Sequence, residues 1–282
     1  MPSKTESVRL PKRALIGMVH IGALPGTPRG GMPVEELCRR AAIEAKVLAD
    51  AGFDALIIEN MHDRPYVHGR KGPETVAVMV RAAMAVRAVA PKLPIGVQVL
   101  SGGNHEALAI AQCAGAGPGA GGRGGSGGFI RCENFVFGHV ADEGLLARAE
   151  AGSLLRYRRE IGAVGIKIFC DLKKKHASHA ITADLSLADV AEGAEFFGAD
   201  GLIVTGSATG KPTSLADLKE VRHASRLPLL VGSGVTPQTV VTLLEIADGL
   251  IVGSYLKKGG HWTGAIDPAR CRAIVKARGS TR

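Results

Sequence analysis

The sequence predicts an α/β protein that folds as a single (βα)8 barrel, or TIM barrel, across residues 1–282. Short apolar runs of strand length alternate eight times with longer runs of helical periodicity, which predicts a parallel sheet that closes on itself. The length of 282 residues is close to the ~250 that such a barrel needs. Glycine-rich turns follow the last two strands, and the runner-up fold, a doubly wound open sheet, does not explain them.

The elements follow from these runs in chain order. We expect strands at Ala14–His20, Asp54–Glu59, Pro94–Leu100, Gly128–Glu133, Val164–Asp171, Gly201–Thr205, Pro228–Val231 and Gly249–Val252. We expect helices at Glu35–Ala51, Glu74–Ala90, Glu106–Ala114, Leu145–Ile161, Leu187–Phe197, Leu215–Ala224, Pro237–Ile246 and Pro268–Ala277.

The last two strands carry a phosphate-binding motif near the C-terminus. Each ends in a turn whose glycines remove side chains, so backbone N–H groups there can approach an anion closely. Paired turns of this kind, followed by a short helix N-terminus after Ser254, form the phosphate site of many (βα)8 barrels. The predicted phosphate-binding residues are Gly232, Ser233, Gly234, Gly253 and Ser254.

One segment does not fit the alternation. Gly115–Gly128 (GAGPGAGGRGGSGG) lies between a predicted helix and the next strand, and its composition is that of a flexible linker. Loops from helix to strand lie on the face of a barrel away from its active site. We therefore predict a flexible insertion on the face opposite the site.

Composition narrows the class of protein. The chain is 46% hydrophobic with a formal net charge of +9, which favours acidic ligands, but it shows neither a basic stripe with aromatics nor a nucleic-acid reader motif. Five scattered cysteines without a C-x-x-C pair are typical of a reduced compartment. We see no signal peptide and no transmembrane segment, and we expect a cytoplasmic protein. Whether copies form a homo-oligomer stays open.

Polar residues concentrate at the carboxyl ends of the strands, where barrels bind ligands. Glu59 ends the alternating run Ala55–Ile57–Glu59 and should point into the barrel mouth, either as a base or as a partner of Arg131. The predicted catalytic residues are Glu59, Asp171, Lys175 and His176. The predicted substrate-binding residues are His20, Asn60, Asp63, Asn104, Arg131, Thr205 and Gly206.

A lysine inside a predicted strand, Lys167, is unusual. It either forms a Schiff base, as lysines of barrel aldolases do, or pairs with Asp171 or another interior carboxylate, and we favour the ion pair. The loop after Asp171 carries three lysines and a histidine. One of the lysines could bind a phosphate or carboxylate, and the alternative is that the whole segment is a solvated basic loop.

Nine stretches, spread over nearly the whole chain, match one protein family as a set: IGMVHIGALPGTP, AGFDALIIENMHDRPY, GVQVLSGGNHEALAIA, FIRCENFVFGHVADEGLL, LLRYRREIG, DLKKKHASHA, ADGLIVTGSATGKPT, VGSGVT and ADGLIVGSYLKKGG. Through them the chain resembles the BtpA family, which is named for a protein needed for photosystem I accumulation. The resemblance implies a barrel of the ribulose-phosphate-binding type, with Gly232–Gly234 and Gly253–Ser254 as phosphate contacts. The glycine-rich insertion departs from the family pattern. VGSGVT and ADGLIVGS are also similar to the α subunit of tryptophan synthase, which places a glutamate after its second strand for acid–base work.

The sequence is compatible with three functions. The first is a lyase, aldolase or isomerase that acts on a phosphorylated small molecule, without a cofactor. The second is a non-catalytic assembly or stability factor. The third is a hydrolase or lyase that uses Mg²⁺ held by Glu59, Glu133 and Asp171. Several interior carboxylates favour an enzyme, because a scaffold does not need them.

Overall fold

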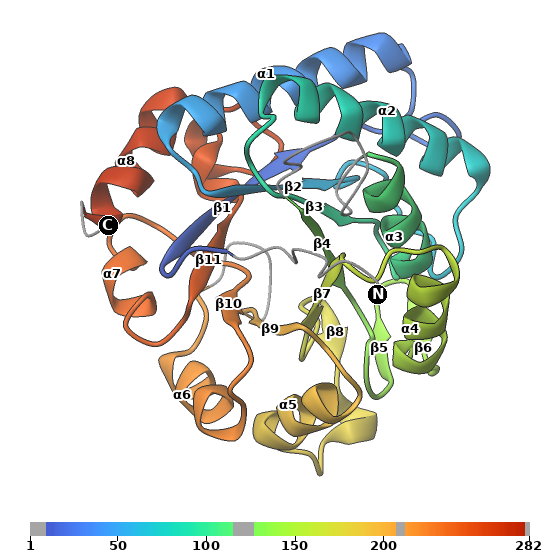
Figure 1. Ribbon diagram of the computed structural model, residues 1–282, viewed down its shortest axis with the longest axis vertical. Helices are drawn as coiled ribbons and strands as arrows, with labels where there is room; N and C mark the ends of the chain where they lie inside the picture. Colours follow the sequence, from blue (N-terminus) through green and yellow to red (C-terminus); the bar gives the residue numbers. More distant parts are fainter. Residues whose placement is uncertain (1–9, 115–126, 207–211, 280–282) are drawn as a thin grey trace, which may run out of the picture.

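The computed structural model describes residues 10–114, 127–206 and 212–279, and eight parallel strands close in it into a barrel (Figure 1). The strands are β1 (Ala14–His20), β2 (Ala55–Glu59), β3 (Ile95–Gln98), β4 (Gly128–Cys132), β7 (Lys167–Asp171), β9 (Gly201–Val204), β10 (Leu229–Val231) and β11 (Gly249–Val252). Because β1 pairs with both β2 and β11, the barrel sheet has no free edge. The predicted (βα)8 barrel is confirmed.

Helices surround the barrel. They are α1 (Val34–Ala51), α2 (Pro73–Val89), α3 (Asn104–Cys113), α4 (Ala151–Glu160), α5 (Leu187–Phe196), α6 (Leu215–Ala224), α7 (Val240–Leu243) and α8 (Pro268–Arg278). In α1, the buried residues Leu37, Ala41, Ala45 and Leu48 recur every three or four positions and face the strands. Helix α1 packs between α2 and α8, so the first and last helices of the barrel lie side by side (Figure 1). No helix in the described ranges is long and apolar enough to cross a membrane.

An apolar plug fills the inside of the barrel. The rings of Phe129 and Phe169 meet edge to face with their centroids 5.4 Å apart. Glycine makes room for them on the neighbouring strands: a Cβ on Gly96 would lie 2.4 Å from Phe129, and one on Gly201 would lie 2.2 Å from Phe169. Both glycines are therefore required by packing, and the plug closes the barrel beneath the mouth.

Strand alternation places polar side chains directly above this plug. Inward-facing positions on a strand recur every two residues, so Ile57 of the plug is followed on the same face by Glu59. The same spacing puts Arg131 above Phe129 and Asp171 above Phe169. The mouth of the barrel is thus a polar layer on an apolar base.

One predicted helix is wrong at its start. Leu145 and Leu146 belong to a strand rather than to the expected helix Leu145–Ile161, of which only α4 forms. The strands β5 (His139–Ala141), β6 (Gly144–Leu146) and β8 (Ala177–Ser178) make a small antiparallel sheet in the order β6, β5, β8. Gly144, with φ of 110°, opens β6 after a tight turn that bends the chain back on β5.

Other predicted bounds shift. The strand expected at Val164–Asp171 begins at Lys167, and the helix expected at Pro237–Ile246 shortens to α7 because residues 237–239 form a turn. Of the glycine-rich segment, residues 115–126 lie outside the described residues, so the predicted flexible insertion stays a prediction.

Candidate functional site

A cavity of about 270 Å³ opens at the carboxyl ends of the barrel strands, and we call it the phosphate-side cavity. Its walls combine the two predicted glycine turns with charged residues from four other segments of the chain. The lining residues are Met18, His20, Glu59, Met61, Arg131, Lys175, Gly232, Ser233, Gly234, Val235, Thr236, Gly253, Ser254, Tyr255, Gly260 and Arg270. All five predicted phosphate-binding residues are among them.

The glycines of the turn after β10 stand where a side chain would not fit. A Cβ on Gly232 would lie 2.6 Å from Thr205 Cγ2 and 3.1 Å from Arg131 Nη2. Gly234 has φ of 73°, a conformation that favours glycine. The Ser233 hydroxyl accepts a hydrogen bond of 2.8 Å from the Gly206 backbone N–H, which ties this turn to the end of β9. The turn is therefore fixed in place with its backbone at the cavity wall.

The turn after β11 completes this wall. Gly253 precedes a short 3₁₀ helix, Ser254–Leu256, so the predicted helix N-terminus exists as a single turn. Within the described ranges, the backbone N–H groups of Gly234 and Ser254 donate no hydrogen bond. Both groups line a cavity, so an anion could accept hydrogen bonds from them.

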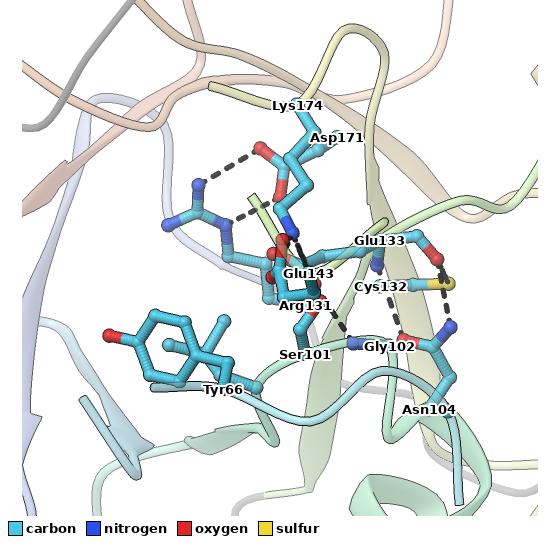
Figure 2. Close-up of polar contacts among 12 residues, drawn as sticks. Tyr66, Ser101, Gly102, Asn104, Arg131, Cys132, Glu133, Glu143, Asp171 and Lys174 are labelled. Carbon is cyan, nitrogen blue, oxygen red and sulfur yellow. Dashed lines mark hydrogen bonds and ion pairs between the residues drawn. The ribbon is translucent and has the colours of Figure 1, made fainter. Parts of the chain in front are cut away.

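A buried ion pair crosses the floor of the mouth. Arg131 donates from Nε and Nη2 to the two carboxylate oxygens of Asp171 at 2.8 and 2.9 Å, and both side chains are almost fully buried (Figure 2). Burial alone would lower the pKa of Arg131, but the Asp171 charge outweighs it and raises that pKa. Arg131 is thus a permanent cation, and its partner is Asp171 rather than Glu59.

Glu59 faces the same cavity from the end of β2. Burial raises the pKa of its carboxyl, although the charges of Lys175 and Arg131 act in the opposite direction. His20 Nε2 lies 3.6 Å from Glu59 Oε2, and burial together with Lys257 holds the pKa of His20 well below its ordinary value. The pair is therefore a neutral imidazole beside a carboxyl group with increased proton affinity, which suits proton transfer near neutral pH.

Two more basic side chains line the cavity besides Arg131. Lys175 comes from the loop after β7 and is half-buried. Arg270 comes from α8, where it stacks over the Tyr255 ring at 4.0 Å and donates from Nε to the Tyr255 carbonyl at 2.5 Å. The two guanidinium cations, Arg131 and Arg270, make this cavity suitable for an anionic ligand.

A second, mostly apolar cavity of about 250 Å³ adjoins the first, and we call it the substrate-side cavity. The two cavities share Glu59, Met61 and Lys175. Its other lining residues are Arg64, Tyr66, Gln98, Leu100, Glu133, Asp142, Glu143, Lys174, His176 and Trp262. Gln98 Oε1 is buried there without a hydrogen-bond partner among the described residues, so it can accept a hydrogen bond from a ligand.

A hydrogen-bonded network holds the wall between this cavity and β3. Glu133 Oε2 accepts from the Gly102 backbone N–H at 2.9 Å and from the Ser101 hydroxyl at 3.2 Å. Lys174 donates to Ser101 Oγ at 3.0 Å and to Glu143 at 2.6 Å (Figure 2). Glu143 reaches this position because it lies in the turn between β5 and β6, which the sequence did not predict.

Five predicted substrate-binding residues line neither cavity: Asn60, Asp63, Asn104, Thr205 and Gly206. Their polar atoms are used within the protein. Asn60 donates to Asp63 at 2.8 Å and accepts from the Leu100 backbone N–H at 2.7 Å. Asn104 donates to the Glu133 carbonyl at 2.8 Å. These contacts hold the loops around the mouth, and a role of the five residues in substrate binding stays a prediction.

Lys167 lies at the opposite end of the barrel from the mouth. Its ammonium pairs with Asp200 at 2.9 Å, and Arg158 pairs with the same carboxylate at 2.6 Å. The predicted interior ion pair exists, but its partner is not Asp171. Lys167 cannot reach a ligand in the mouth.

Sequence reasoning missed several lining residues. Arg270 and Trp262 follow β11 by many positions, and the route of the connecting loop was not predictable from local pattern. Trp262 is the one tryptophan of the chain, which is the only signal that could have indicated it.

The predicted catalytic residue His176 is exposed, has φ of 55° and lines the substrate-side cavity.

The magnesium hypothesis required Glu59, Glu133 and Asp171 to converge. Within the described residues, no group of three or more His, Cys, Asp or Glu side chains is arranged to hold a metal ion. Asp171 is bound by Arg131, and Glu133 accepts hydrogen bonds from Ser101 and Gly102. These three residues therefore do not form the expected magnesium site.

Fold and mouth together define a (βα)8-barrel protein with a charged, ligand-sized site at the carboxyl ends of its strands. The chain belongs to the BtpA family, whose model matches residues 11–279. The resemblance predicted from the sequence motifs is thus confirmed.

Relatives agree with this family assignment, and solved structures share the barrel fold. An uncharacterized mitochondrial protein of Caenorhabditis elegans is 41% identical over 93% of this chain and 91% of its own. The photosystem I biogenesis protein BtpA of Synechocystis is 36% identical over 93% of this chain and 87% of its own. The structure of (S)-3-O-geranylgeranylglyceryl phosphate synthase from Thermoplasma acidophilum with sn-glycerol-1-phosphate has a TM-score of 0.56 at 14% identity, covering 94% of this chain and 93% of that one.

The Arg131–Asp171 pair makes a prediction about stability. In Asp171→Asn, the buried guanidinium of Arg131 loses its counter-charge, so we expect the free energy of unfolding to fall by about 3–5 kcal/mol. Urea unfolding at neutral pH measures this. Asp50→Asn breaks the exposed pair with Lys46 and should change little. An Asp171→Asn variant as stable as the Asp50→Asn variant would contradict the role given to the pair.

Glu59 makes a prediction about pH. Its folded-state pKa is raised above the ordinary value of 4.5, so ionisation of Glu59 destabilises the fold as pH rises above that value. Glu59→Gln should therefore be more stable than the wild type at pH 7, and the difference should shrink towards pH 4. Denaturant unfolding at both pH values tests this. Glu36→Gln is the control of opposite sign, because Arg39 and Arg40 lower the pKa of Glu36 to about 2. A Glu59→Gln variant that is less stable than the wild type at pH 7 would refute the raised pKa of Glu59.

Proposed function

We propose that this protein binds a phosphorylated small molecule in the barrel mouth and catalyses a proton-transfer reaction on it, as a lyase, aldolase or isomerase. One observation carries the proposal: two glycine turns, two arginines and a lysine converge on a single cavity of about 270 Å³ beside a carboxyl group of raised proton affinity. The phosphate sits against Gly232–Gly234 and Gly253–Ser254. Arg270 adds a guanidinium, the side chain best suited to bind a phosphate through two hydrogen bonds.

The rest of the substrate extends into the substrate-side cavity. The two cavities are joined at Glu59 and Lys175, so the reacting centre lies between the phosphate and the other end of the ligand. Together they fall in the range of about 300–1,000 Å³ that small-molecule sites span. The unpartnered amide oxygen of Gln98 selects a substrate with a hydrogen-bond donor at that end.

Glu59 is the residue that carries the proton in this proposal. It contacts both cavities, and general acid–base catalysis of this kind contributes about 10²–10⁴ to a rate. Asp171 keeps Arg131 charged and in place and acts as a positioning residue. His20, held neutral beside Glu59, orients that carboxyl or exchanges a proton with it.

Similar barrels support the phosphate assignment. The synthase from Thermoplasma acidophilum holds sn-glycerol-1-phosphate. The phosphoribosyl anthranilate isomerase of Thermus thermophilus, with a TM-score of 0.53 and 13% identity over 95% of this chain and all of that one, is also named for a phosphorylated substrate. These likenesses show the fold, and the glycine turns and cations of this chain give the reason to propose the ligand.

A second candidate is an assembly or stability factor, because one relative is named for photosystem I biogenesis. The buried charges of the mouth argue for the enzyme. Glu59 lies in an environment that opposes its ionisation, and a protein that only docks a partner gains nothing from that cost.

The phosphate cradle is tested by Gly234→Asp, which places a negative charge and a side chain against the proposed phosphate. Calorimetric titration with ribose 5-phosphate should show at least a tenfold loss of affinity, about 1.4 kcal/mol. Arg270→Gln should weaken binding in the same direction. The matched control is Gly31→Asp, in an exposed loop where an added Cβ meets nothing within 4 Å. Unchanged affinity in folded Gly234→Asp and Arg270→Gln proteins would place the phosphate site elsewhere.

A further inference from the structure

Three consecutive lysines follow β7, and their environments differ sharply. The ammonium of Lys173 donates to the Leu185 carbonyl at 3.3 Å. The ammonium of Lys174 is held by Glu143 at 2.6 Å. The ammonium of Lys175 makes no hydrogen bond or ion pair with any described residue, and this residue alone of the three borders both cavities.

The surroundings of Lys175 favour a neutral amine. Burial lowers the pKa of Lys175, and the fixed charge of Arg131 acts in the same direction against Glu59 and Asp171. Arg131 stays charged because Asp171 binds it through two hydrogen bonds. A half-buried amine beside a permanent cation loses its proton more readily than an exposed lysine, and the neutral amine is the nucleophile.

We propose that Lys175 forms an imine with the carbonyl carbon of a phosphorylated aldehyde or ketone. This inference rests on the proposed function and names its substrate class. With the phosphate on the glycine turns, the carbonyl group reaches the junction of the two cavities, which Lys175 and Glu59 both line. The chemistry considered for Lys167 from the sequence therefore belongs to Lys175.

The step balances without any further reagent. The neutral Lys175 amine attacks the carbonyl carbon, a C–N bond forms, and the carbonyl oxygen takes a proton to give a carbinolamine. That hydroxyl then leaves as water with a second proton, and the C=N bond forms. Both protons come from the amine nitrogen, and Glu59 relays them to the oxygen. Protonated on nitrogen by the Glu59 carboxyl group, the imine becomes an iminium that withdraws electrons, so a neighbouring carbon can lose a proton or break a carbon–carbon bond.

Reductive trapping tests the proposal on the wild-type chain. The protein is incubated with glyceraldehyde 3-phosphate and sodium cyanoborohydride, which reduces an imine to a stable secondary amine, and the modified lysine is mapped by peptide mass spectrometry. We expect one adduct per chain, at Lys175, at least about tenfold above any other lysine, because a phosphate bound on the glycine turns holds the carbonyl group beside Lys175. Unphosphorylated glyceraldehyde should label Lys175 far less.

Matched variants complete the test. Lys175→Arg keeps a long basic side chain but cannot form an imine, so the specific adduct should disappear, while ribose 5-phosphate still binds through the glycine turns and Arg270. Lys173→Arg and Lys167→Arg should retain the adduct. Labelling spread evenly over surface lysines, in a protein that binds ribose 5-phosphate, would overturn the imine and leave the proposed phosphate site standing. Absence of both labelling and phosphate binding would overturn the proposed function and the imine together.

Discussion

The buried pair of Arg131 and Asp171 sets the charge of the barrel mouth, and the properties of the site depend on it. It lies directly above the Phe129–Phe169 plug, and both of its side chains are almost fully buried, so solvent screens the pair weakly. Because the Asp171 carboxylate is bound through both oxygens, Arg131 remains a cation at every accessible pH. That fixed cation favours anionic ligands, lowers the pKa of Lys175 and moderates the effect of burial on Glu59. Burying the pair costs desolvation free energy, and in return the mouth holds a fixed positive charge.

The fold was predictable because barrel strands are local apolar runs and alternation depends only on period two. This rule placed Glu59, Arg131 and Asp171 in the mouth without knowledge of the structure. The hairpin β5–β6 was not predictable, since β5 also pairs with β8, more than thirty residues further along the chain. Its leucines match a helical pattern as well as a strand, and only non-local pairing decides between the two.

The site was predictable in part. Glycine turns after both of the last two strands indicated the phosphate-side cavity, because paired turns of this kind leave backbone N–H groups open to an anion. Polar residue type alone did not separate ligand-facing side chains from those that fix loops: Asn60 and Asn104 hydrogen-bond to the backbone of neighbouring loops. Nor did the run of three lysines show which ammonium is unpaired, because that depends on Glu143 in the unpredicted hairpin. Arg270 reaches the cavity through α8, which no local signal links to it.

We propose that one ligand spans the mouth, with its phosphate on the glycine turns and its reactive end between Glu59 and Lys175. A crystal structure of the protein with bound ribose 5-phosphate would show whether it does. We expect phosphate oxygens within hydrogen-bond distance of the Gly234 and Ser254 backbone N–H groups and of Arg270, with the sugar directed towards Lys175. A phosphate bound outside the mouth, or a sugar directed away from Glu59 and Lys175, would contradict it.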